Sequence, residues 1–390
     1  MLDTAGPVQR RAQLRQGHRG AVVEPAGGTA FAQRPVHRGV ERERGGQRER
    51  GGQRERGGQR EGGEPSSRNT RWSGRRPSRS CWASWRCTRT GWPERLRAVL
   101  TEFRLTGRPH GGLVLTNLPV DETAVGATPS DYTAVPGGAE VTTATAVLLL
   151  IGSLLGDPFS YLSQQRGKLV LDVFPIAGHE EQQVGSSSAS LLEWHNEDAF
   201  HPHRADWVML LCLRNPDAVP TMFAPVVDLK VPDEQREVLF EERFVILPDE
   251  SHTAAFNSET TGFDANSRQA DAFARIQRMN LTPERISILS GDPDSPYVRI
   301  DPAFMQHGLN DPAAEQALEA TIEAFTACMK DVALTTGELL IIDNKRAVHG
   351  RRPFQARYDG TDRWLRRINV SADLRSSSGR RFGAHGRALV

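Results

Sequence analysis

Cysteine is scarce in this sequence, with four residues among 390. Cys81 and Cys87 lie in a polar N-terminal region, whereas Cys212 and Cys328 lie within apolar runs, as small core residues do. These positions form neither a disulfide framework nor a cysteine metal site. A reducing, cytoplasmic location is therefore the expectation.

Long apolar runs are also missing. A membrane-spanning helix needs roughly 20 consecutive apolar residues, and the stretch AVLLLIGSLL at 146–155 is too short for that purpose. No segment has the apolar centre of a signal peptide. The sequence therefore predicts no membrane anchor.

The first 90 residues lack lysine altogether. They carry 20 arginines and eight acidic residues, a formal charge of +12 that the remainder of the chain nearly cancels. Within them the hexapeptide RERGGQ starts at Arg42, Arg48 and Arg54. A repeat without apolar side chains cannot bury a face, so we expect residues 1–90 to form a disordered extension. One interpretation is nucleic-acid binding through phosphate charge; the preferred one is translated sequence upstream of the true start.

The rest of the chain predicts one folded domain, 91–378, followed by a frayed end at 379–390. Many short apolar strands accompany a few helices, which favours a mainly β, jelly-roll core (a double-stranded β-helix) with flanking helices. The polar segment around 231–280 is predicted to be an insertion or lid. Helices are expected at 94–103, 142–155, 233–244 and 311–332, and strands at 111–120, 168–174, 207–213, 221–229, 297–301, 339–342 and 363–370.

Two residues in LEWHNEDAFHPHR (192–204) indicate a metal site. In an extended strand, side chains alternate between faces, so His195 and Glu197 would point the same way. His349 follows the apolar run 339–342 and is the best candidate for a third ligand. Two histidines and one carboxylate form the facial triad of non-haem Fe(II) oxygenases, which leaves positions open for co-substrate and O₂. The alternative is that His195 and Glu197 are an ordinary surface pair.

Arg363 and Arg367 lie four residues apart on one face of the predicted strand 363–370. A guanidinium group is planar and permanently charged, and it binds carboxylates with two parallel hydrogen bonds. Iron oxygenases that use 2-oxoglutarate need a cation for its distal carboxylate. The two arginines therefore strengthen the interpretation of the triad.

The segments WHNEDAFHPHRADWVMLLCLRN (194–215) and GELLIIDNKRAVHGRRPFQARYDGTDRWLRRINVSADLR (337–375) resemble a known family. They look like the clavaminate synthase-like, TauD-type branch of the Fe(II)/2-oxoglutarate oxygenases. Within it, the similarity is greatest to the free L-arginine β-hydroxylases of peptide-antibiotic biosynthesis. The resemblance covers roughly residues 93–377 and none of the N-terminal extension.

By this resemblance His195, Glu197 and His349 match the iron ligands, and Arg363 matches the arginine that pairs with the far carboxylate of 2-oxoglutarate. Thr221 could bind the metal-side end of the same co-substrate. The resemblance implies that decarboxylation of 2-oxoglutarate drives hydroxylation of an unactivated carbon, Cβ or Cγ, of a free amino acid.

The resemblance also implies the amino-acid contacts. Arg367 matches the residue for the α-carboxylate, Gln164 the residue for the α-amino group, and Asp301 a carboxylate that faces a guanidinium. Arginine-type members have acids at alternate positions there, whereas Ala303 follows Asp301-Pro302 in this sequence. Several substrates therefore stay open: arginine or a guanidino relative, and also citrulline, asparagine, lysine or a cyclic guanidino amino acid. A jelly-roll binding module without catalytic activity is the alternative from a different class.

Overall fold

The structure is a computed structural model that describes residues 93–390, apart from 262–268, 309 and 384. The extension predicted at 1–90, with its possible nucleic-acid contact, lies outside the described residues. Among the helices that are described, none combines the length and the apolar character that crossing a bilayer requires.

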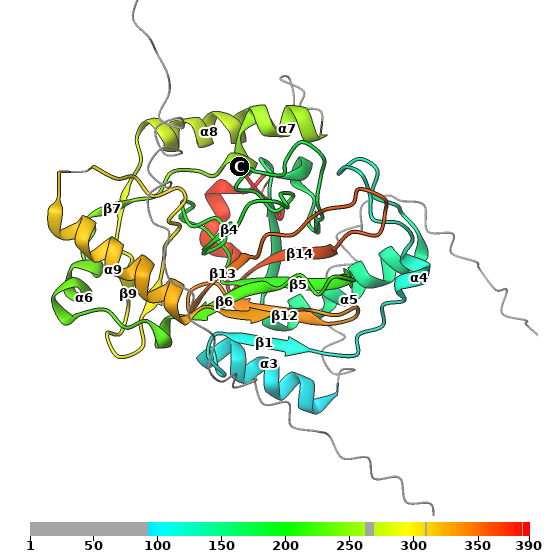
Figure 1. Cartoon of the computed structure of the whole chain (residues 1–390), viewed down its shortest axis with the longest axis horizontal. Helices are drawn as coiled ribbons and strands as arrows, with labels where there is room; N and C mark the ends of the chain where they lie inside the picture. The colour runs from blue at the N-terminus through cyan, green and yellow to red at the C-terminus, as the bar shows by residue number, and fades with distance from the viewer. Residues whose placement is uncertain (1–92, 262–268, 309, 384) are drawn as a thin grey trace, which may run out of the picture. The chain divides into compact units, whose positions relative to one another are not determined.

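Two β-sheets form the centre of the described chain (Figure 1). The strands of the larger sheet are β1 (Gly112–Leu115), β2 (Asp157–Tyr161), β3 (Leu171–Val173), β5 (Trp207–Arg214), β12 (Leu339–Asp343), β14 (Trp364–Ser371) and β15 (Ala388–Leu389). They run in the order β1-β12-β5-β14-β2-β15, and β3 also pairs with β14. The smaller sheet contains β4 (Leu192–His195), β6 (Thr221–Pro225), β11 (Lys330–Val332) and β13 (Ala347–Arg351), in the order β11-β6-β13-β4.

The remaining elements surround these sheets. Two short ribbons pair β7 (Phe244–Val245) with β8 (Arg285–Ile286) and β9 (Leu289–Ser290) with β10 (Tyr297–Val298). The α-helices are α3 (Glu94–Thr106), α4 (Glu122–Val125), α5 (Ala139–Leu155), α6 (Asp233–Leu239), α7 (Ala254–Thr261), α8 (Gln269–Leu281) and α9 (Pro312–Cys328). Short 3₁₀ helices are η2 (Gln165–Gly167), η3 (Val226–Asp228), η4 (Glu250–His252) and η5 (Leu374–Arg380).

The apolar strand β5 has both faces buried, which explains its unbroken hydrophobic sequence. Its side chains alternate between two layers. Met209 and Leu211 belong to a cluster with α3 and α5, which cover the outer face of the larger sheet. Val208 and Leu210 belong to a cluster that includes Phe223 of the smaller sheet. The core therefore lies on both sides of the larger sheet.

A separate apolar cluster joins the smaller sheet to α6 and α9. Trp194 of β4 packs on Phe325 of α9, with ring centroids 5.0 Å apart. The start of α9 is capped by Asp311, whose side chain accepts a hydrogen bond from the Ala314 backbone N–H at 3.2 Å. This packing holds β4, the strand that ends at His195, against a helix.

A buried ion pair connects β3 to β14. Asp172 accepts hydrogen bonds from Arg366 Nε at 2.9 Å and from Trp364 Nε1 at 3.0 Å, and all three residues are buried. Both oxygens of the carboxylate are engaged, since Arg366 Nη2 lies 3.2 Å from Oδ2. Such a pair is costly to break from one side only. It therefore holds the part of β14 that lies between Arg363 and Arg367.

The predicted mainly β core with flanking helices is confirmed. Two predicted helices extend too far, each because pairing in a sheet overrides local sequence preference. The helix expected at 311–332 ends at Cys328, since Lys330–Val332 pairs with β6. The helix expected at 233–244 ends at Leu239, since Phe244 and Val245 pair with β8.

The frayed end predicted for 379–390 is also wrong, because Ala388 and Leu389 form a parallel pair with β2, and Leu389 is buried. The strand β2 itself was missed, since Pro158 in its sequence argues against a strand. Within the segment around 231–280, predicted to be an insertion or lid, α6 was expected, whereas α7 and α8 were missed.

We expect Gly156→Ala to destabilise the protein. A Cβ at this position would lie 2.1 Å from the backbone oxygen of Ser371, which cannot move without disturbing β14. Overpacking of this kind costs about 1–3 kcal/mol, and each kcal/mol lowers the melting temperature of a domain of about 150–250 residues by roughly 2–4 °C.

Gly137→Ala is the matched control, because nothing lies within 4 Å of a Cβ there. Its free energy of unfolding should change by less than about 0.5 kcal/mol. Calorimetry of the two variants would contradict this account of the junction between α5 and β2 if they melted at the same temperature.

Candidate functional site

A cavity lined by residues of both sheets contains most of the predicted site residues. The smaller sheet contributes His195, His349 and Thr221, and the larger sheet contributes Arg367, with Arg363 directly preceding β14. Loops at 249–251 and 301–304 supply further lining residues. The strands thus collect side chains from distant parts of the sequence in one place.

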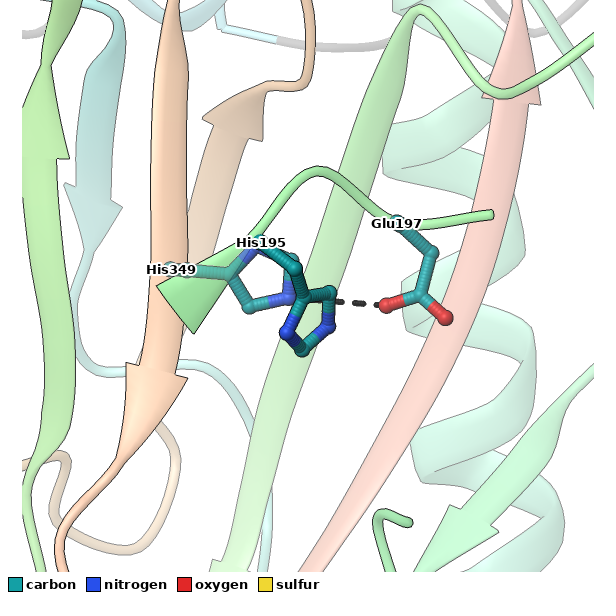
Figure 2. A group of neighbouring side chains, drawn as sticks. All are labelled: His195, Glu197 and His349. Carbon is teal, nitrogen blue, oxygen red and sulfur yellow. Dashed lines mark ion pairs between the residues drawn. The ribbon is translucent and has the colours of Figure 1, made fainter. Parts of the chain in front are cut away.

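Antiparallel pairing of β13 with β4 places His349 directly opposite His195. The two imidazole rings lie side by side, with centroids 4.8 Å apart, and the Glu197 carboxylate is directed at them (Figure 2). His349 Nε2 is 3.4 Å from Glu197 Oε2. The potential ligand atoms of the three residues all lie within 4.8 Å of one another.

Glu197 reaches this position from a turn and not from a strand. The strand β4 ends at His195, so the predicted alternation along a continuous strand is wrong at Glu197. Two buried asparagines fix the turn instead. Asn196 Nδ2 donates to the carbonyls of Asn344 and Ala347, each at 2.9 Å, and the Glu197 backbone N–H donates to Asn344 Oδ1 at 2.8 Å.

The donor set fits Fe(II). His195 Nδ1 lies 2.7 Å from the Glu193 carbonyl, so a proton on Nδ1 is donated there and Nε2 keeps a lone pair. Among the described residues His349 Nδ1 is a buried polar atom without a hydrogen-bond partner, which a bound ligand could satisfy. Two imidazoles and one carboxylate in a buried cluster are the ligands that non-haem iron oxygenases use.

Arg363 is a buried cation without a carboxylate partner in the described part of the chain. Its Nη2 donates to Thr221 Oγ1 at 3.2 Å, and burial lowers its pKa to about 10. Burial of an unpaired charge is costly unless a ligand of opposite charge completes the site. The far carboxylate of 2-oxoglutarate fits this requirement. Thr221 lies beside Arg363 in the same cavity, and its predicted contact with the metal-side end of 2-oxoglutarate stays a prediction.

Arg367 and Gln164 meet beside the triad. Arg367 Nη1 pairs with Glu197 Oε1, and Arg367 Nη2 donates to Gln164 Oε1 at 3.3 Å. Burial raises the pKa of Glu197, but Arg367 and His349 outweigh it, so the pKa falls well below its ordinary value. The carboxylate is therefore ionised, as a metal ligand must be.

Acidic side chains form a second group in the cavity. Burial raises the pKa of Asp301 to about 7, His195 opposes the rise, and the nearby charge of Asp249 adds to it. Asp249 and Ser251 also line the cavity and were missed by the sequence analysis. Their only signal was the tripeptide Asp249-Glu250-Ser251 within a polar segment, which by itself is typical of a solvated loop.

A profile of the taurine catabolism dioxygenase TauD, TfdA family matches residues 96–369. Among curated proteins, the chain is 43% identical to an enduracididine beta-hydroxylase of Streptomyces hygroscopicus over 301 residues, which cover 76% of this chain and 87% of that protein. It is 41% identical to an L-ornithine/L-arginine 3-hydroxylase of Catenulispora acidiphila over 288 residues, 74% of this chain and 84% of that protein.

Solved structures agree with this similarity. The non-heme iron oxygenase OrfP, crystallised with Fe, succinate and (3S)-hydroxy-L-Arg, aligns with a TM-score of 0.72 and 41% identity over 77% of this chain and 88% of that chain. The predicted enzyme class, fold and cofactors are confirmed: this is a non-haem iron oxygenase that uses 2-oxoglutarate. The chain belongs to the taurine catabolism dioxygenase TauD, TfdA family.

Proposed function

We propose that this enzyme hydroxylates Cβ of a free guanidino amino acid, either L-arginine or a cyclic relative. The observation that carries the proposal is the placement of two buried or half-buried carboxylates, Asp249 and Asp301, in the same cavity as Arg363 and Arg367. An amino acid that has a cationic side chain and an α-carboxylate is complementary in charge to such a cavity.

The two acids recognise the cation. Asp301 is 8% exposed, and its raised pKa reflects the cost of ionising a buried carboxyl beside Asp249. A guanidinium between the two carboxylates removes that cost and presents donors to both. Asp249 thereby supplies the second carboxylate, since this sequence has Ala303 where arginine-type members have their second acid.

The two ends of the amino acid are then held separately. Arg367 binds the α-carboxylate, and Gln164, which contacts Arg367 at 3.3 Å, binds the α-amino group. With both ends held, one C–H bond faces the metal centre, and a displacement of about 1 Å would change the carbon that reacts.

His195, Glu197 and His349 hold the iron, which, when bound, supplies the activation of O₂ and the oxidative decarboxylation of 2-oxoglutarate. Arg363, with Thr221 beside it, holds the far carboxylate of 2-oxoglutarate. The larger sheet closes the cavity with Leu210 and Leu365, which exclude water from the reacting groups.

The names of the relatives support Cβ over Cγ. One relative is named a beta-hydroxylase of enduracididine and another a 3-hydroxylase of ornithine and arginine, whereas the lysine 4-hydroxylases are 26–27% identical to this chain. The free thiols of Cys212 and Cys328 are consistent with a reducing, cytoplasmic setting for this reaction.

The first prediction of this proposal concerns substrate choice. The protein, loaded with Fe(II) and 2-oxoglutarate without oxygen, is exposed to O₂ with single free amino acids, and succinate and product mass are measured. We expect arginine or a cyclic guanidino amino acid to stimulate succinate formation and to gain one oxygen atom at Cβ. If asparagine or citrulline stimulated succinate formation more than every cationic amino acid, the substrate would be a neutral amino acid and not a guanidino one. If no amino acid stimulated it, the proposal would be overturned.

The second prediction concerns the metal ligands. His349→Ala should lose Fe(II) binding and turnover, since it removes one of three ligands, while the melting temperature of the metal-free protein stays nearly unchanged because the side chain lines a cavity. Metal content after gel filtration, succinate formation and calorimetry test this directly. Stoichiometric iron and normal turnover in this variant would remove His349 from the triad.

The third prediction concerns the two acids. Asp249→Asn and Asp301→Asn each keep the shape of the side chain and remove its charge, so the KM for arginine should rise by about tenfold or more, as expected when a charged hydrogen bond is lost. The KM for 2-oxoglutarate should change by less than about twofold, because that co-substrate is recognised by other groups. Asp294→Asn, at an exposed acid, is the matched control. Unchanged arginine kinetics in both site variants would contradict the assignment of the cation site.

A further inference from the structure

A buried network next to the cavity has His252 at its centre. This side chain is 0% exposed, and both ring nitrogens are engaged. Nδ1 lies 2.6 Å from Ser163 Oγ, and Nε2 lies 2.8 Å from Asp198 Oδ1. His252 thus joins three segments: η4, the loop after β2, and the turn that carries Glu197.

The first of these segments presents the cation site. Asp249 directly precedes η4, and Ser251 lies within it; both line the cavity. Asp249 Oδ1 accepts hydrogen bonds from the backbone N–H and the hydroxyl of Ser251, at 2.9 and 2.5 Å. Ser251 Oγ in turn accepts a hydrogen bond from Gln164 Nε2 at 2.8 Å. A shift of η4 would therefore move Asp249 together with Ser251, the hydrogen-bond partner of Gln164.

The second anchor lies beside the metal ligands. Asp198 follows Glu197 directly, and its Oδ2 accepts a hydrogen bond from Asn369 Nδ2 at 3.0 Å. Asn369 lies two residues after Arg367 on β14, so both side chains are on the same face of the strand. Through Asp198, the position of His252 is set by the turn and the strand that carry Glu197 and Arg367.

Aromatic packing fixes the ring itself. The imidazole of His252 meets Tyr161 and Phe200 edge-on, with centroids 5.1 and 5.0 Å away. Donor atoms of Asp198, Asp249 and His252 also lie within 4.8 Å of one another. Hydrogen bonds to Asn369, Ser251 and Ser163 engage these three side chains and connect the segments that carry them.

We propose that His252 is a positioning residue for the amino-acid substrate. It holds Asp249 and Ser251 in a fixed relation to Glu197, Gln164 and Arg367, and thereby sets where the cationic end of the substrate lies relative to the metal centre. The inference rests on the proposed function. It goes beyond that function because it names a residue that lines no part of the cavity and yet controls how 2-oxoglutarate consumption is coupled to hydroxylation.

The test compares two variants at this position. His252→Phe keeps an aromatic ring between Tyr161 and Phe200 and removes both hydrogen-bonding nitrogens. His252→Gln retains an amide N–H that can donate to Asp198. Leu148→Ala, in the fully buried face of α5 away from the cavity, is the control for general loss of stability. For each, the KM values for the amino acid and 2-oxoglutarate and the ratio of hydroxylated product to succinate are measured.

In His252→Phe we expect the KM for the amino acid to rise by about tenfold, as when a buried polar link is lost, and the KM for 2-oxoglutarate to stay within about twofold. The ratio of product to succinate should fall to about half or less, because a misplaced substrate triggers turnover without being hydroxylated. His252→Gln should recover part of both effects, and Leu148→Ala should change neither. Equal changes in both KM values, or a normal product ratio in His252→Phe, would overturn the proposal.

Hydrogen exchange separates this inference from the proposed function. Peptides covering 249–257 should exchange faster in His252→Phe than in the parent protein, while peptides of β5 and β12 stay protected, because only the local anchor is lost. If no amino acid stimulates the parent enzyme, the proposed function fails, and the exchange data still test whether His252 holds the segment 249–257 in place. Unchanged exchange at 249–257 would show that His252 does not hold this segment.

Discussion

The pairing of β13 with β4 is the interaction on which the rest of the site depends. It places His349 opposite His195, although the two residues are far apart in the sequence. Asn196 and Asn344 extend the pairing beyond the end of β4 and bring Glu197 to the same point. Because these polar groups are buried and hydrogen-bonded within the protein, the turn is held in place by the chain's own contacts.

The basic and the acidic residues of the cavity lie on different elements of the fold. Arg363 directly precedes β14 and Arg367 lies within it, and the buried pair of Arg366 and Asp172 fixes the segment between them. The acids come from loops, Asp249 beside η4 and Asp301 after β10. The two sheets and the segments directly attached to them thus carry the groups that we propose for iron and for the carboxylates. Loops carry the two acids that we propose for the cation, and loops vary more among related proteins than the elements they connect.

Sequence patterns predicted the parts of this protein that follow local rules. The apolar strands at 207–213 and 339–342 were found from periodicity. The group of His195, Glu197 and His349 was found from ligand chemistry, although Glu197 lies in a turn and not on the predicted strand. Strand β2 was missed because a proline argues against a strand in a sequence, whereas in the fold Pro158 pairs with Val370 of β14. Asp249 and Ser251 were missed for a similar reason: an acid and a serine in a polar loop look solvated until the fold turns them toward a cavity.

The central claim is that two carboxylates in the cavity select a cationic side chain. Calorimetric titration of the oxygen-free Fe(II) and 2-oxoglutarate complex with L-arginine and with L-citrulline tests it directly, because the two amino acids differ little in shape and citrulline lacks the charge. The account predicts that arginine binds at least about tenfold more tightly, since the neutral group leaves buried carboxylates unpaired. Equal affinity, or tighter binding of citrulline, would contradict it.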